Sequence, residues 1–380
     1  MTMSKQIKVM TIFGTRPEAI KMAPIVLQLQ QQERFIPVTV VTAQHREMLD
    51  QVLDIFHITP DYDLNIMKPN QTLAGITSRV LTKLDAIMDE VKPDIVLVHG
   101  DTTTTFAASV SAFYHQIPVG HIEAGLRTWD KYSPYPEEMN RQLTDVLADM
   151  YFAPTELSRQ NLLKEHHADK NISVTGNTAI DALKQTVSKD YQHDALKLIQ
   201  PGHRMILLTM HRRENQGAPM ETVFHVVKAV VKQHPDVEVV YPVHLSPTVQ
   251  AVAKRVLGNT ERIHLIDPLD VVDFHNMAAR SYFIMTDSGG VQEEAPSLNK
   301  PVLVLRETTE RPEGVTAGTL KLVGTDGQKV TAAMNQLLDD KQEYQRMADA
   351  KNPYGDGHAA EYILNNIYNK MIKWIYMNVK

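Results

Sequence analysis

The chain has 380 residues and no cysteine, is 43% hydrophobic, and carries a net charge of −6 from 39 basic and 45 acidic side chains. This length predicts two domains, and the absence of cysteine excludes disulfides, thiolate metal sites and cysteine nucleophiles. The acidic excess argues against a general nucleic-acid binder, and no apolar run approaches the length of a membrane span. With no export signal in view, we expect a cytoplasmic protein without nucleic-acid or membrane partners.

Short apolar runs alternate with amphipathic stretches, a pattern typical of buried parallel strands joined by helices. Strands of a first series are predicted at residues 7–13, 37–42, 95–99, 118–122 and 150–153. Those of a second series are predicted at 205–209, 237–242, 263–265, 282–285 and 302–305, with a helix over 221–233. We therefore expect an α/β protein with two Rossmann-like domains that face a cleft.

The change from the first series to the second places the domain boundary near residue 172. We expect an N-terminal domain over residues 1–172 and a C-terminal domain over residues 173–361. The last stretch, about residues 362–380, has a helical pattern rich in aromatic residues. We expect this helix to pack back on the N-terminal domain.

The loops that follow the strands are the places to look for a site, because open α/β sheets bind ligands beyond the carboxyl ends of their strands. The first is "FGTRPEAIKMAP", in which Gly14 permits a tight turn and Arg16 and Lys21 lie near a helix N-terminus that favours anions. An ordinary capped surface helix would also explain these residues. The sequence contains neither a G-x-G-x-x-G fingerprint nor a Walker A loop.

Carboxylates end two further strands, at Asp101 in "VHGDTTTT" and at Glu123 in "HIEAGLRT", and Glu137 and Arg141 follow in a long loop. Carboxylates that converge at strand ends can perform acid/base chemistry. Simpler explanations are a helix cap at Asp101 and a surface helix pair between Glu137 and Arg141. A metal site is also conceivable, formed by His99, Asp101, His121 and Glu123.

In the second series, "TMHRRENQG" places His211, Arg212 and Arg213 after the first strand. In "DSGGVQEEAP", Ser288, Gly289 and Gly290 would bring backbone N–H groups close to an anion, and Glu294 could bind a ribose diol. Arg306 and Arg311 would add charge for a diphosphate. The alternative is a plain glycine turn with solvated charges. Together the loops predict a two-domain enzyme that acts on a nucleotide sugar in the interdomain cleft.

Long ordered motifs give the chain a specific resemblance. They are "FGTRPEAIKMAP", "TAQHREMLDQVL", "VHGDTTTT", "HIEAGLRT", "PEEMNRQLTD", "HRREN" and "DSGGVQEEAP…RETTERPEG". From about Lys8 to the C-terminal helix, the chain resembles the bacterial non-hydrolysing UDP-N-acetylglucosamine 2-epimerases. The resemblance implies a glycosyltransferase-B type architecture, a homodimer and no cofactor or metal. It also implies interconversion of UDP-GlcNAc and UDP-ManNAc for cell-surface polysaccharides such as teichoic acids.

The resemblance further implies a mechanism, in which UDP is eliminated to give 2-acetamidoglucal, stays bound and adds back. The implied catalytic residues are Asp101, Glu123, Glu137 and His211. Those implied for substrate binding are Arg16, Lys21, Arg141, Leu269, Phe274, Ser288, Gly289, Gly290, Glu294 and Arg311, with Leu269 and Phe274 in the uracil pocket. Which carboxylate serves which face of the sugar is not readable from sequence.

A second, allosteric UDP-GlcNAc site is implied at Gln44, His45, Arg212 and His244. Two positions depart from the family pattern, with Glu47 where Gln is expected and Asn70 where Arg is expected. Each departure removes a favourable partner of a diphosphate. We therefore expect activation by UDP-GlcNAc to be weak.

Three alternatives remain for the activity. A glycosyltransferase of the same architecture would bind the same UDP-sugar, and a hydrolysing epimerase would release ManNAc and free UDP. A non-catalytic regulator that binds nucleotide sugars would turn nothing over.

Overall fold

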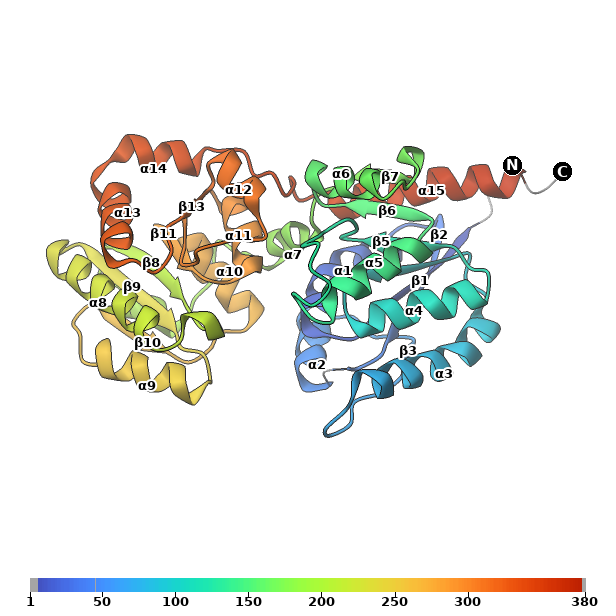
Figure 1. Cartoon of the computed structure of the whole chain (residues 1–380), viewed down its shortest axis with the longest axis horizontal. Helices are drawn as coiled ribbons and strands as arrows, with labels where there is room; N and C mark the ends of the chain where they lie inside the picture. Colours follow the sequence, from blue (N-terminus) through green and yellow to red (C-terminus); the bar gives the residue numbers. More distant parts are fainter. Residues whose placement is uncertain (1–5, 45, 378–380) are drawn as a thin grey trace. The chain divides into compact units, whose positions relative to one another are not determined.

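The protein is described by a computed structural model that covers residues 6–44 and 46–377. Its contacts divide the chain into two compact units (Figure 1). The N-terminal domain comprises Met1–Ala182 together with Tyr354–Lys380, and the C-terminal domain comprises Leu183–Pro353. Each contains one parallel sheet covered by helices, so the expected α/β class with two Rossmann-like domains is confirmed.

The N-terminal sheet has seven parallel strands in the order β3-β2-β1-β4-β5-β6-β7. They are β1 (Ile7–Phe13), β2 (Phe35–Val41), β3 (Tyr62–Asp63), β4 (Ile95–His99), β5 (Val119–Ile122), β6 (Met150–Ala153) and β7 (Ile172–Val174). The strand order reverses between β1 and β4, which pair directly through Val9 and Ile95. A reversal of this kind leaves a crevice at the carboxyl ends of the two strands, so the loops after β1 and β4 meet at a natural binding place.

The two faces of this sheet carry separate hydrophobic cores. Val9 and Phe13 of β1 belong to one core, and Met10 and Ile12 belong to the other, because successive side chains of a strand point to opposite faces. The helices of the domain are α1 (Arg16–Gln30), α2 (Arg46–Ile55), α3 (Leu73–Val91), α4 (Thr103–Tyr114), α5 (Glu137–Leu147), α6 (Glu156–Lys164) and α15 (Ala359–Met377), with the 3-10 turn η1 (Asp169–Asn171). Helix α7 (Thr178–Thr186) begins in this domain and crosses the boundary after Ala182.

Helix α15 returns to the N-terminal domain at the end of the chain. Its residues Ile363, Leu364 and Ile367 are fully buried in the same core as α1. At its start, the N–H groups of Ala359 and Ala360 donate to the carboxylate of Asp181 at 3.2 and 2.9 Å. The last helix is therefore part of the N-terminal core.

The contacts place the domain boundary after Ala182, whereas the sequence suggested a boundary at residue 172. The reason is that β7 pairs with β6 through Ile172 and Tyr151, so it is the seventh strand of the N-terminal sheet. Ala182 is buried in the N-terminal core. The chain returns to this domain at Tyr354, before the expected residue 362.

The C-terminal sheet has six parallel strands in the order β10-β9-β8-β11-β12-β13. They are β8 (Arg204–Thr209), β9 (Val237–Pro242), β10 (Ile263–Ile266), β11 (Phe283–Thr286), β12 (Val302–Val304) and β13 (Leu320–Leu322). The helices are α8 (Ala218–Gln233), α9 (Pro247–Val256), α10 (Val271–Arg280), α11 (Gly289–Glu294), α12 (Pro312–Ala317), α13 (Gly327–Asp339) and α14 (Lys341–Ala348). Three 3-10 turns complete it: η2 (Asp194–Leu198), η3 (Arg213–Asn215) and η4 (Ala295–Leu298).

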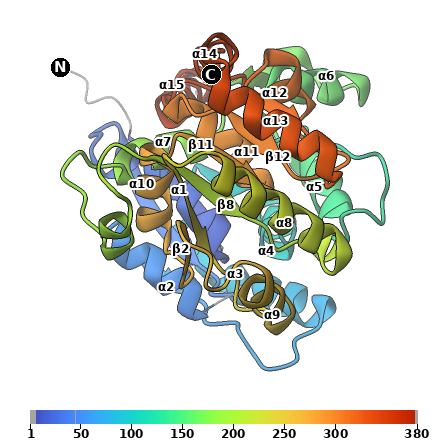
Figure 2. The same cartoon turned by 90° about the vertical axis from the view of Figure 1, so that its left-hand side faces the viewer.

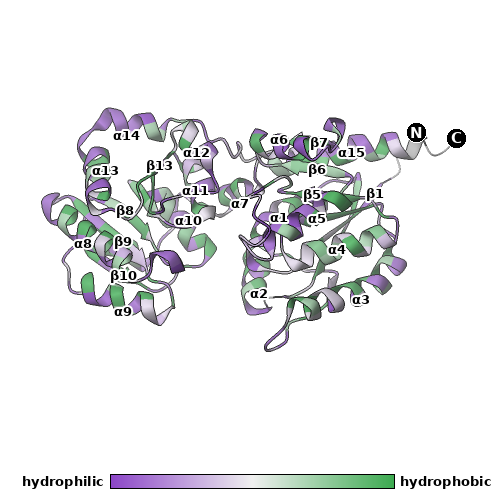
Figure 3. Ribbon diagram, in the orientation of Figure 1, coloured by the Kyte–Doolittle hydropathy of each residue, from purple (hydrophilic) through white to green (hydrophobic). Residues whose placement is uncertain are grey.

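Helices cover both faces of the C-terminal sheet (Figure 2). Side chains of α8, α9 and α13 share one core with Phe283 of β11, and side chains of α10 and α11 share the other with Ile284. Figure 3 shows the hydrophobic residues gathered on the strands and on the helix faces that cover them. Across the described residues, no helix combines the length and apolar character that a bilayer crossing requires.

All ten strands expected from the hydrophobic pattern are present, with ends that differ by one or two residues. The strands that the pattern missed are β3, β7 and β13, which have only two or three residues each. A run this short carries too few alternating positions to stand out from a loop.

Replacing Leu364 of α15 by alanine should destabilise the N-terminal domain by about 2–5 kcal/mol, because it leaves a cavity at a fully buried position. Glu361→Ala, an exposed change on the same helix, is the control, since its ion pair with His358 is solvent-exposed and contributes little. Differential scanning calorimetry measures both. Equal melting temperatures for the two variants would contradict the packing of α15.

Candidate active site

The loop after β1 is held by a capping box at the start of α1. The Thr15 side chain accepts from the N–H of Glu18, and the Glu18 carboxylate accepts from the N–H groups of Gly14 and Thr15 at 3.0 and 2.8 Å. Gly14 packs so closely that a Cβ there would lie 1.9 Å from Oγ1 of Thr42. This geometry places Arg16 at the first position of α1, where it is partly exposed.

Glu18 also ties this loop to the loop after β4. Its Oε1 accepts hydrogen bonds from the hydroxyls of Thr102 and Thr105 at 2.6 and 3.0 Å. Burial raises the pKa of Glu18, although these hydrogen bonds oppose the change. The sequence analysis missed Glu18. The spacing Thr15-x-x-Glu18 is the signal that could have found it, and the tie explains why threonines open α4.

Glu123 lies directly after β5 in a left-handed backbone conformation, with φ +66°. Its carboxylate forms an ion pair with Lys21 and accepts from Nδ2 of Asn177 at 3.0 Å. Nε2 of His99 lies 3.5 Å from the same carboxylate, but the two groups form no hydrogen bond. Burial lowers the pKa of His99 to about 3, so this imidazole is neutral. Because His99 is neutral, Lys21 is the cation that pairs with Glu123.

Asp101 begins the turn after β4, and its side chain is 27% exposed. Nη2 of Arg141, from α5, lies 2.7 Å from Oδ2 of Asp101. Burial is the main cause that raises the pKa of the Asp101 carboxyl. Arg141 opposes this change, and the negative charges of Glu123 and Glu137 add to it. The predicted carboxylates therefore lie within electrostatic reach of one another.

Glu137 and Glu138 open helix α5 and differ in environment. Glu137 is partly exposed. Glu138 is fully buried and accepts from the N–H groups of Thr128 and Trp129, both at 3.1 Å. Glu138 thus anchors the preceding loop, which leaves Glu137 as the carboxylate of this pair that solvent and ligands can reach.

In the C-terminal domain, Asp287 holds the loop after β8 against the end of β11. This side chain is fully buried, and its Oδ2 accepts from the N–H groups of His211 and Arg212 at 3.0 and 2.9 Å and from Nδ2 of Asn215 at 3.0 Å. The sequence analysis assigned it no role. A carboxylate that ends a buried strand next to two glycines is the signal that could have found it.

The predicted anion turn lies at the start of α11, which Ser288 begins without a side-chain cap. A Cβ on Gly289 would lie 3.1 Å from the guanidinium of Arg311, so this backbone and that cation lie together. Arg311 is oriented by Glu293, which accepts from its Nε at 2.8 Å. A turn of backbone N–H groups with an adjacent arginine suits a phosphate.

Glu294 follows on the same short helix and lies beside this turn. A Cβ on Gly290 would be 3.7 Å from its Oε1, and Nε2 of His275 lies 3.4 Å from its Oε2. Leu269 and Phe274 are partly buried against the core to which α11 contributes. The structure thus brings the anion turn, a carboxylate and an apolar wall together in one domain.

The residues expected at the second site lie on both domains. Gln44 accepts from the Thr104 hydroxyl at 3.0 Å, while His45 lies outside the described residues. The rings of His211 and His244 stack with centroids 5.1 Å apart. Burial lowers the pKa of His211, with His244 and Arg212 acting in the same direction and Asp287 opposing.

The alternative of a metal site does not fit the geometry of His121, whose two ring nitrogens are occupied by Asp145 and by the Gly100 carbonyl. Within residues 6–44 and 46–377, no group of three or more histidine, aspartate or glutamate side chains is arranged to hold a metal ion.

Comparison with known proteins identifies the family of the chain. A family model described as UDP-N-acetylglucosamine 2-epimerase matches residues 27–368. The chain belongs to the UDP-N-acetylglucosamine 2-epimerase family. It is 61% identical over 363 residues to the UDP-N-acetylglucosamine 2-epimerase of Bacillus subtilis, covering 96% of this chain and 95% of the relative.

Two solved structures of this family show the same fold. A Listeria monocytogenes protein described as a putative UDP-N-acetylglucosamine 2-epimerase is 57% identical, with a TM-score of 0.93 and 97% of each chain covered. The Neisseria meningitidis UDP-GlcNAc 2-epimerase bound to UDP-GlcNAc is 49% identical, with a TM-score of 0.85, covering 96% of this chain and 100% of that one. The epimerase chain described here thus has the expected glycosyltransferase-B type architecture.

Glu18→Ala should destabilise the N-terminal domain by about 2–4 kcal/mol, because it leaves buried backbone N–H groups without an acceptor. Glu33→Ala, at an exposed glutamate of the same domain, is the matched control and should change little. Thermal unfolding of both variants measures the difference. If Glu18→Ala has the same melting temperature as the wild type, the role of Glu18 in holding the two loops together is refuted.

Proposed function

We propose that this chain catalyses the reversible epimerisation of UDP-GlcNAc to UDP-ManNAc at C2, by elimination of UDP and its re-addition. The observation that carries the proposal is the division of groups between the two domains. The N-terminal domain gathers Asp101, Glu123 and Glu137, and the C-terminal domain gathers the Gly289 turn, Arg311 and Glu294. Membership of the family, and the UDP-GlcNAc bound to the Neisseria relative, support the substrate.

The chemistry requires both sets of groups. The C2 proton of the sugar is not acidic, since no carbonyl adjoins it. When the bond between C1 and the UDP oxygen breaks, C1 gains oxocarbenium character and a carboxylate can take the C2 proton. The products are 2-acetamidoglucal and UDP. Protonation of C2 from the opposite face, with return of UDP to C1, completes the epimerisation.

Asp101 and Glu123 differ in a way that suits proton transfer on two faces. Burial raises the pKa of Asp101, so this carboxyl can hold a proton closer to neutral pH. Lys21 stabilises the charge on Glu123. Two carboxyl groups whose environments separate their protonation can act as acid and base, and they exchange roles when the reaction reverses. Glu137 is the third group of this set.

Retention of UDP is the task proposed for the C-terminal domain. The N–H groups of the Ser288–Gly290 turn and the Arg311 guanidinium bind the departing diphosphate, aided by His211 and by Arg16 of the first loop. Glu294 binds the ribose diol, and Leu269 and Phe274 receive the uracil. UDP held in this way remains available for re-addition.

The family resemblance supports further properties of the chain. These are a homodimer, a product that supplies ManNAc for cell-surface polysaccharides, and a second UDP-GlcNAc site at Gln44, His45, Arg212 and His244. Glu47 and Asn70 are both exposed. They weaken that second site because Glu47 adds a negative charge near a diphosphate and Asn70 lacks the positive charge of arginine. Activation by UDP-GlcNAc is therefore weak in this chain.

A product assay with UDP-GlcNAc as sole substrate separates this activity from its rivals. Formation of UDP-ManNAc supports the epimerase, and UDP with free ManNAc indicates the hydrolysing reaction. No product indicates a glycosyltransferase that lacks its acceptor, or a regulator.

Glu294→Ala should weaken UDP binding by about 1.5–3 kcal/mol, the range for hydrogen bonds to a charged group. Asp101→Asn should leave UDP binding intact and abolish most turnover, because Asp101 belongs to the proton-transfer set. Calorimetric titration with UDP and the product assay measure both variants. The opposite pattern would contradict the division of roles.

Epimerisation in D2O should place deuterium at C2 of the UDP-ManNAc formed, because the proton removed by a carboxyl group exchanges with solvent before one is redelivered. Mass spectrometry of product made without added cofactor detects it. A product without deuterium, or a requirement for NAD, would refute elimination and re-addition.

A further inference from the structure

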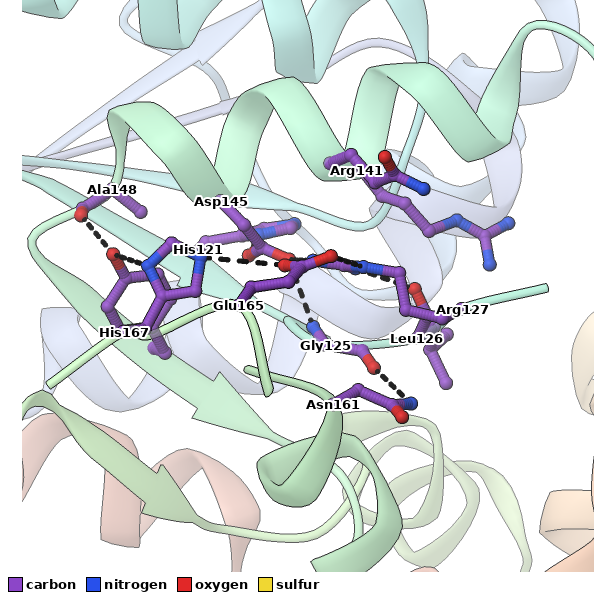
Figure 4. Close-up of polar contacts among 12 residues, drawn as sticks. His121, Gly125, Leu126, Arg127, Arg141, Asp145, Ala148, Asn161, Glu165 and His167 are labelled. Carbon is purple, nitrogen blue, oxygen red and sulfur yellow. Dashed lines mark hydrogen bonds and ion pairs between the residues drawn. The ribbon is translucent and has the colours of Figure 1, made fainter. Parts of the chain in front are cut away.

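A buried histidine lies beneath the two loops that carry Asp101 and Glu123. His121 of β5 is fully buried. Its Nδ1 lies 2.6 Å from Oδ1 of Asp145, on α5 (Figure 4). Its Nε2 lies 2.7 Å from the carbonyl oxygen of Gly100. Neither contact involves solvent, and the proposed chemistry assigns this residue no role.

The partners of His121 fix its protonation. A backbone carbonyl can only accept a hydrogen bond, so Nε2 carries a proton. Asp145 also only accepts when it is ionised, and then Nδ1 carries a proton as well. Burial by itself would raise the pKa of Asp145, but His121 and Arg127 outweigh that effect and the pKa is lowered. Both ring nitrogens of His121 thus face acceptors, an arrangement that favours the imidazolium form, which donates from both.

The Asp145 carboxylate faces Arg127 as well as His121. Nη2 of Arg127 lies 2.6 Å from Oδ2 of Asp145, and the same guanidinium donates twice to Glu165, at 2.8 and 2.6 Å (Figure 4). Two carboxylates thus face Arg127 and His121. Glu165 is partly exposed, so Asp145 is the fully buried carboxylate of the two, and a protonated His121 adds to its stabilisation by Arg127.

Both ends of the His121–Asp145 pair bind backbone of the candidate site. His121 holds the carbonyl of Gly100, which has φ +67° and directly precedes Asp101. Asp145 accepts from the N–H of Gly125 at 3.3 Å, two residues after Glu123. Gly125 has φ +85°, and a Cβ there would lie 2.3 Å from a neighbouring carbonyl oxygen, so this turn cannot shift freely.

We propose that the His121–Asp145 ion pair is a positioning device, which sets the Asp101 and Glu123 loops relative to each other. The inference rests on the proposed function, because it treats those two carboxylates as the proton-transfer groups. His121 and Asp145 do not touch substrate. Other titratable groups on the elements packed around the pair are His99, Tyr151, Glu165 and His167.

Nitrogen-15 NMR of the imidazole groups tests the charge without reference to activity. The signal of His121, assigned among the 16 histidines by its loss in His121→Gln, should show two protonated ring nitrogens, because each faces an acceptor. Asp145→Asn preserves a hydrogen bond to Nδ1 but removes the compensating charge, so the signal should become that of a neutral ring. A neutral His121 in the wild-type protein would overturn the proposal.

Steady-state kinetics test the positioning role. His121→Gln should lower kcat by about 10²-fold, the loss expected from a misplacement of about 1 Å, while KM and the affinity for UDP stay unchanged. His121→Gln/Asp145→Asn restores charge balance and should turn over about tenfold faster than His121→Gln alone. If His121 were merely structural, stability and UDP binding would fall in parallel with kcat. The losses in the double variant would then be additive. Either result would overturn the proposal.

His167→Gln is the matched control. His167 bonds to the Tyr151 hydroxyl at 2.9 Å and lies 3.5 Å from Glu165, but bonds to neither loop, so its kcat should equal that of the wild type. If His121→Gln does not fold, Asp145→Asn carries the kinetic test, and an unchanged kcat there overturns the proposal. Absence of UDP-ManNAc from the wild-type enzyme would refute the proposed function instead, and the NMR result would still decide the charge of His121.

Discussion

A buried carboxylate that accepts backbone N–H groups is the interaction on which the candidate site residues of each domain depend. Parallel strands end abruptly, and the N–H groups of the loops that follow must find acceptors away from water. The Glu18 carboxylate is the acceptor for the loop after β1, and the Asp287 carboxylate is the acceptor for the loop after β8. In each domain the same carboxylate also reaches a second strand end, so one side chain fixes two loops.

Because some carboxylates bind groups of the protein itself, their sequence neighbours remain available for the roles proposed with substrate. Glu138 anchors the loop before α5 and leaves Glu137 accessible. Glu293 orients Arg311 and leaves Glu294 beside the glycine turn. In both places two glutamates are adjacent in sequence, and one stabilises the fold while the other has the role proposed in substrate binding or catalysis. Adjacent acidic residues at a strand or helix end therefore need not share a role.

Several partly or fully buried carboxylates of the N-terminal domain are paired with basic side chains. Asp101 faces Arg141, Glu123 faces Lys21, and Asp145 lies between His121 and Arg127. An unpaired buried charge is costly, and removing one partner of such a pair usually destabilises a protein by several kcal/mol. The result is a rigid frame in which Asp101, with its raised pKa, remains partly exposed.

The sequence by itself determined the α/β class, ten of the strands and the loops that carry Asp101, Glu123 and Ser288, because hydrophobic periodicity and glycine placement are local properties. It also determined the family, through long motifs. Only the tertiary structure decided that β7 belongs to the N-terminal sheet, that Arg141 faces Asp101, and that Glu18, Asp145 and Asp287 hold the loops. Those contacts join residues far apart in the chain, so a local signal can mark a carboxylate, but only the fold shows which donors it accepts from.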